Sequence, residues 1–111
     1  MSDAREQRIA RNEILFREIN ERLKEMQETF NVENDRADFV CECGDVECTD
    51  RIELSLAEYE HLRGDSTTFA VVPGHQLDDV EVVVETHEEH LIVRKRGGEA
   101  AKMAREGDPR R

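Results

Sequence analysis

The sequence of 111 residues predicts an α+β fold, in which a long N-terminal helix precedes a small, mostly antiparallel β domain with one short helix. Three observations support this prediction. Residues 4–30 contain no Gly or Pro and repeat their apolar residues every seven positions. Residues 38–96 contain several short runs rich in β-branched residues, separated by residues that form turns. One S-x-x-E sequence in this second region marks the start of a short helix.

The long helix has two possible roles. Its apolar residues occupy the a and d positions of a heptad, with Asn12 at one d position. In the favoured interpretation the helix packs on the sheet of its own domain. In the alternative it forms a coiled-coil seam with a second chain, and the chain is a homodimer whose register is fixed by Asn12. The turn-forming residues 31–36 are expected to end the helix. The apolar heptad positions are Ile9, Phe16, Ile19, Leu23, Met26 and Phe30.

The β domain is predicted from its alternating apolar residues and its turns. Ser55 and Glu58 form a capping box at the start of a short helix, and Gly64 ends that helix. The last two strands form a hairpin around residues 87–90. Up to five short strands are expected, over residues 38–43, 51–55, 67–72, 79–86 and 90–96.

These elements divide the chain into three parts. Residues 1–38 are an amphipathic helix and a linker, and residues 39–96 are a small α+β domain. Residues 97–111 begin with two glycines and carry an excess of basic residues, which predicts a flexible tail.

The charge distribution limits the possible partners. The net charge is −11, and residues 39–93 contain fourteen acidic but only two basic side chains. Such a surface repels phosphate backbones, so direct binding of nucleic acid is not expected. No apolar run is long enough to span a membrane, and no secretory signal is visible. We therefore expect a cytoplasmic protein, in which thiols stay reduced.

All three cysteines lie within eight residues, at Cys41, Cys43 and Cys48, with the spacing C-x-C-x4-C. In a regular strand Cys41 and Cys43 point to the same face, and a turn at Gly44-Asp45 can return Cys48 to them. Clustered thiols in a reducing compartment favour a metal site, and zinc is the expected ion. The alternatives are buried cysteines without a ligand and a redox switch.

A structural zinc site needs a fourth ligand, and His75 is the best candidate. It follows a strand end on a turn in which Pro73 fixes one backbone angle and Gly74 gives freedom. His61 is expected on the surface of the short helix. His87 and His90 are expected in a solvated hairpin turn, with a second, weak ion as the alternative.

Catalysis is not expected. Three thiolates reduce the Lewis acidity of zinc, and the chain has neither an H-E-x-x-H motif nor a phosphate-binding glycine loop. Four acidic residues near the cysteines are expected to raise the pKa of each thiol when no metal is bound and to favour a cation otherwise. These residues are Glu42, Asp45, Glu47 and Asp50.

The segments NEILFREINERLKEM, FVCECGDVECTDRIELSLAEYEHLR and FAVVPGH together resemble a group of small uncharacterised actinobacterial proteins, usually called hypothetical. The resemblance covers residues 12–95. It implies a helix followed by a three-cysteine segment, an L-x-E-Y helix and a P-G-H turn. It also implies that Cys41, Cys43, Cys48 and His75 recur as a set. It implies no activity.

The predicted function is a non-enzymatic, zinc-stabilised interaction module with a regulatory role. Its acidic surface and long helix would bind a protein partner whose identity the sequence does not give. The first alternative is a transcription-associated regulator that contacts protein or nucleic acid. The second is a thiol or zinc sensor that changes shape when zinc leaves.

Overall fold

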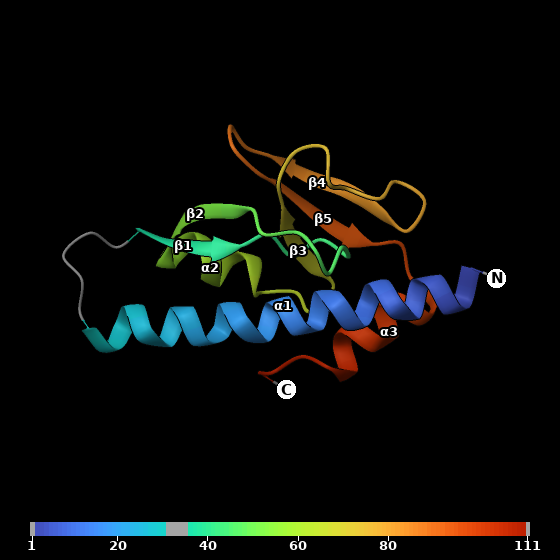
Figure 1. Cartoon of the computed structure of the whole chain (residues 1–111), viewed down its shortest axis with the longest axis horizontal. Coiled ribbons are helices and arrows are strands. Elements are labelled where there is room, and N and C mark those ends of the chain that lie inside the picture. Colours follow the sequence, from blue (N-terminus) through green and yellow to red (C-terminus); the bar gives the residue numbers. More distant parts are fainter. Residues whose placement is uncertain (1, 31–35, 111) are drawn as a thin grey trace.

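In the computed structural model the described residues are 2–30 and 36–110, without the side chains of residues 2, 3, 29, 30 and 99. The predicted turn at 31–36 therefore lies outside the described residues, except for Arg36. The α+β prediction is confirmed (Figure 1). In chain order the elements are α1 (Ser2–Phe30), β1 (Arg36–Val40), β2 (Arg51–Ser55), α2 (Leu56–Leu62), β3 (Thr68–Val71), β4 (Glu81–Thr86), β5 (Leu91–Lys95) and α3 (Gly98–Glu106).

The helix α1 runs along the length of the molecule and packs against β1 and α3 (Figure 1). The heptad a residues Ile9 and Phe16 are buried within the chain, which confirms packing on its own domain. The d residues Ile19 and Met26 are exposed, as is Leu15. The a and d residues therefore do not form one exposed coiled-coil interface, because the a residues are covered by the rest of the same chain.

The strands form two antiparallel sheets. β1 pairs with β2, and Phe39 lies opposite Ile52. β3, β5 and β4 form the second sheet in that order, and β4 and β5 are the predicted hairpin. The first strand ends at Val40, three residues before the expected end, so the cysteines lie outside it.

The helix α2 closes the core between the sheets. The predicted capping box is confirmed: the Ser55 hydroxyl accepts from the N–H of Glu58, and the Glu58 carboxylate accepts from the N–H of Ser55. The helix directs Tyr59 inward, where its ring stacks on Phe39 with centroids 4.6 Å apart. Both rings are buried and join the two-stranded sheet to α2.

The predicted flexible tail at 97–111 is wrong, because this segment contains a helix. Residues Gly98–Glu106 form α3, which packs against α1. Three alanines, Ala100, Ala101 and Ala104, are buried in this contact. Small side chains on one face let two helices approach closely, so a short alanine patch is sufficient to dock the segment. None of the helices within the described ranges has the length and apolar character needed to cross a bilayer.

Candidate metal centre

The structure brings together all four residues that were predicted as metal ligands. One ligand atom from each of Cys41, Cys43, Cys48 and His75 lies within 4.8 Å of the others. The Nδ1 atom of His75 is 3.6 Å from the sulfur of Cys41 and 3.6 Å from the sulfur of Cys48. Three sulfurs and one imidazole nitrogen are a donor set that zinc prefers, and small adjustments of the side chains would close them around one ion.

The segment from Cys41 to Cys43 passes between the two sheets. The N–H of Cys41 donates to the carbonyl of Asp50 (3.0 Å), and the N–H of Glu42 donates to the carbonyl of Ala70 (2.8 Å). The alternation expected of a strand thus persists beyond β1, and Cys41 and Cys43 both reach the site. The chain returns through a turn in which the N–H of Cys48 donates to the carbonyl of Asp45 (3.0 Å).

Glu42, which lies between Cys41 and Cys43, does not face the candidate site. Glu42 is buried and points toward α1, where it accepts from Arg17 (2.9 Å) and Asn20 (2.9 Å). It also accepts from the N–H of Ala70 (3.1 Å). The expectation that Glu42 favours the cation is therefore wrong. Alternation along an extended chain places it opposite its cysteine neighbours, and its role is to hold the cysteine segment against the helix.

His75 is positioned by the predicted P-G-H turn. The N–H of His75 donates to the carbonyl of Val72 (2.9 Å), and Gly74 has a φ of 95°. Proline followed by a glycine with positive φ is typical of a type II turn, so the sequence dictates this geometry. The Nε2 atom of His75 lies 3.3 Å from a carboxylate oxygen of Asp50. A carboxylate on this nitrogen favours the tautomer that leaves Nδ1 free for a metal.

The thiols differ in acidity. A hydrogen bond from Cys41 is the main cause that lowers the pKa of the Cys43 thiol to about 5. The same hydrogen bond, together with burial, raises the pKa of Cys41. Burial raises the pKa of Cys48. The expectation that every thiol pKa is raised is therefore wrong for Cys43, because its neighbours stabilise one thiolate in the cluster.

The helix α1 covers the cysteine loop from the other side. The side-chain amide of Asn12 donates to the carbonyl of Gly44 (2.8 Å). A Cβ atom at Gly44 would lie 2.5 Å from Cγ2 of Ile9, so only glycine allows the helix to come this close. Asn12 therefore serves contacts within the chain. Its position among apolar residues was visible in the sequence, but its partner was not.

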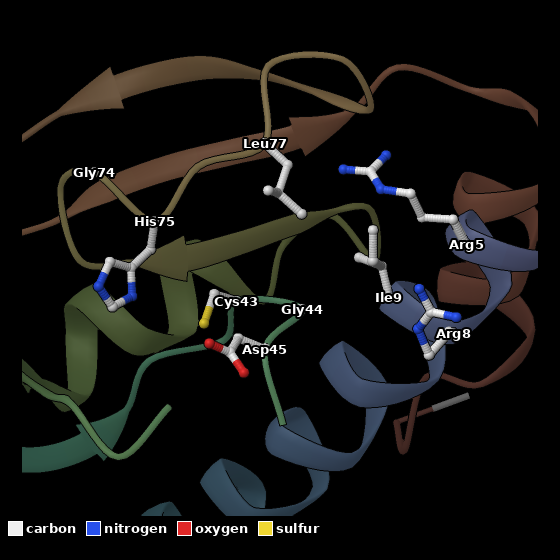
Figure 2. A pocket seen from close by; sticks show the side chains of 9 residues that line it. All are labelled: Arg5, Arg8, Ile9, Cys43, Gly44, Asp45, Gly74, His75 and Leu77. Atoms are coloured by element: carbon white, nitrogen blue, oxygen red, sulfur yellow. The ribbon is translucent and has the colours of Figure 1, made fainter. Parts of the chain in front are cut away.

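An open pocket of about 390 Å³ adjoins the candidate site. Figure 2 shows Cys43 and His75 on one side of this pocket and Arg5 and Arg8 of α1 on the other. Arg5 pairs with Asp79 (2.5 Å). Cys43 lines this pocket, although the residue is only 3% exposed.

The other three histidines lie apart from the cysteines. His61 is exposed on α2, as expected. The solvated turn predicted for His87 and His90 is wrong for His90, whose side chain is buried. Its ring stacks on that of His87, with centroids 4.4 Å apart.

Sequence reasoning missed the buried polar residues that support the site from α1. Arg17 and Asn20 are buried beside the cysteine segment, and Asn20 accepts from the N–H of Val40 (2.8 Å) while donating to its carbonyl (3.0 Å). The signal was the spacing of three and four residues among Glu13, Arg17 and Asn20, which places them on one face of the helix.

Comparisons with known proteins found no match: no family model, curated protein or solved structure matches the chain. The resemblance to the actinobacterial group stays a prediction.

Proposed function

We propose that the chain is a non-enzymatic, zinc-stabilised module that binds another protein in the cytoplasm and has a regulatory role. The observation that supports this proposal is the clustering of Cys41, Cys43, Cys48 and His75 within 4.8 Å. Three thiolates and one imidazole would fill the four positions of a tetrahedral zinc site and leave none for a substrate. A filled site of this kind stabilises a fold and performs no reaction by itself.

The ion would join segments that are far apart in the chain. The cysteines lie between β1 and β2, and His75 lies between β3 and β4. The core of a domain of this size contributes little stability, so a metal cross-link between the two sheets is a substantial addition. Thiolate ligands favour zinc over the hard cations magnesium and calcium.

The surface offered to a protein partner would lie on α1. The exposed residues Leu15, Ile19 and Met26 are spaced by four and seven positions, which places them on the same side of the helix. An apolar stripe with charged neighbours is the pattern by which a helix contacts another protein. We name these three residues the α1 stripe.

The first experiment measures metal in the purified protein and the effect of its removal. We expect about one zinc per chain by elemental analysis, and loss of cooperative thermal unfolding when a chelator removes it. A protein that is metal-free, fully folded and has three titratable thiols would exclude the zinc module.

The second experiment tests partner binding through the α1 stripe. A pull-down with zinc in the buffer would compare the intact protein with the variant Leu15→Lys/Ile19→Lys/Met26→Lys. We expect specific partners to be lost from the variant while its melting temperature stays the same, since the changed side chains are exposed. Retention of the same partners by the folded variant would contradict the proposed surface.

A thiol sensor is a second candidate, because Cys43 lines the open pocket. An oxidant that enters there would convert a thiolate to a sulfenic acid and release zinc. Zinc release by mild peroxide, reversed by a thiol reductant, would support this function. Zinc that stays bound under those conditions would contradict the sensor function and leave only the structural module.

A further inference from the structure

A second group of histidine and carboxylate side chains lies apart from the cysteines. Three of the four histidines of the chain line one pocket together with Glu85. The Nε2 atom of His61 is 2.7 Å from one oxygen of Glu85, and the Nε2 atom of His87 is 2.8 Å from the other oxygen. His90 completes the group by stacking on His87.

The fold brings these residues together from three elements. His61 lies in the last turn of α2, Glu85 lies on β4, and His87 and His90 flank the tip of the β4–β5 hairpin. A β-bulge between Val83 and Glu85 pairs Glu85 with Ile92. A bulge changes the face to which the following side chain points, and here Glu85 and Ile92 line the same pocket.

His90 is the buried member of this group. The residue is only 6% exposed, and its ring stacks on that of His87. His90 lines a pocket of about 220 Å³ together with His61, Glu85 and His87.

We propose that His61, Glu85 and His87 bind a divalent transition metal ion such as zinc at a second site, with the buried imidazole of His90 as a further donor. Imidazole and carboxylate groups are the ligands that zinc, nickel and copper share. In the absence of metal, His61 and His87 approach opposite oxygens of Glu85. These nitrogens are not gathered around one point in the absence of metal, so an ion would be bound after the exposed His61 and His87 side chains rotate toward it.

The site differs from the cysteine cluster in its expected behaviour. It contains no thiolate and opens to solvent, so its ion would exchange readily while the thiolate-bound ion stays. Binding would join α2 to the β4–β5 hairpin. The inference goes beyond the proposed module and shares no residue with it, but its titration rests on that module, because it begins with the cysteine site filled.

The experiment is a calorimetric titration of the full chain with Zn²⁺, beginning with protein that has been saturated at one equivalent and dialysed. We expect a second, weaker binding event of about one equivalent. His61→Ala and His87→Ala should each weaken this event about tenfold or more, because loss of even an outer-shell partner costs that much. Glu89→Gln is the matched control, since Glu89 is exposed at the same hairpin tip outside the cluster.

The two sites can be separated in the same material. Elemental analysis after dialysis counts the tightly held zinc at the cysteines, and this count should be the same in His61→Ala, His87→Ala and the original protein. Thermal melts check that both variants stay folded. The proposal is overturned if no second event occurs, if both histidine variants retain it, or if Glu89→Gln weakens it equally.

Discussion

Arg17 and Glu42 form an ion pair of 2.9 Å inside the protein, with side chains that are 2% and 0% exposed. Arg17 comes from the middle of α1, and Glu42 lies between two of the candidate metal ligands. The pair therefore connects the long helix to the cysteine segment. Arg17 also donates to the carbonyls of Ser66 and Thr68, so the same side chain reaches β3.

We expect Arg17→Met to lower the free energy of unfolding by about 3–5 kcal/mol, because it leaves a buried carboxylate without its counter-charge. Glu42→Gln should cost a similar amount by leaving the guanidinium unpaired. The double variant should cost less than the sum of the two, which urea unfolding can measure. Arg5→Met, at the exposed pair with Asp79, is the control and should cost less than about 1 kcal/mol. Additive losses would show that the two side chains act independently.

Asn12→Leu tests the role of Asn12, the polar residue at a heptad d position of α1. The change removes the hydrogen bond to Gly44 and leaves that carbonyl without its donor, so we expect a loss of about 1 kcal/mol in the free energy of unfolding. Arg22→Leu, at an exposed position of α1, is the control. A paired seam requires the opposite result: a more stable assembly and a changed sedimentation coefficient for Asn12→Leu.

His75→Ala should reduce zinc affinity most strongly among the histidine variants, because it removes one of the four candidate ligands. Asp50→Ala should reduce the affinity about tenfold or more, since it removes the carboxylate that orients His75. Competition with a chelator measures both effects, and melting temperatures should fall in the same order. His61→Ala and His87→Ala should leave the affinity for this tightly held ion unchanged, because both residues lie at the second cluster. An equal loss of that affinity in all four variants would remove His75 from the site.

The free energy of unfolding should depend on pH through Asp108 in the C-terminal segment. Burial alone would raise the pKa of Asp108, but hydrogen bonds from Arg63 and Ser66 lower it below the ordinary value of 3.8. The folded state thus prefers the charged carboxylate, and this stabilisation is complete above pH 3.8 and is lost as the pH falls further. We expect Asp108→Asn to cost about 1–3 kcal/mol at pH 7 and less near pH 3, measured by urea unfolding. A difference that does not change with pH would contradict the ionic role.

Glu13 should produce the opposite pH dependence. Burial raises its pKa from 4.5 to about 8, although the ammonium of Lys95 lies 2.6 Å away. The same ammonium also forms an ion pair with Glu81. The folded state binds this proton more tightly than the unfolded state does. Stability should therefore fall by about 1.4 kcal/mol for each unit of pH between 4.5 and 8. Glu13→Gln should remove that slope in urea unfolding between pH 5 and 9, and an unchanged slope would assign it to another group.

The sequence by itself determined the features that depend on neighbouring residues. The capping box of Ser55 and Glu58, the turn at Pro73-Gly74 and the hairpin around residues 87–90 all form as predicted. Each is stabilised by hydrogen bonds or backbone angles within a few positions, so the local sequence is sufficient.

Only the tertiary structure decided which distant side chains meet. The direction of Glu42, the docking of α3 and the meeting of His61 with Glu85 depend on how α1, α2 and the two sheets pack. From sequence alone, a charged residue is expected to be solvent-exposed unless its buried partner is known. The partner of Arg17 could not be recognised, because Glu42 lies 25 positions away. Burial is a property of the assembled core, which is why the local pattern predicted the elements and the candidate ligands but not the charged residues that hold them in place.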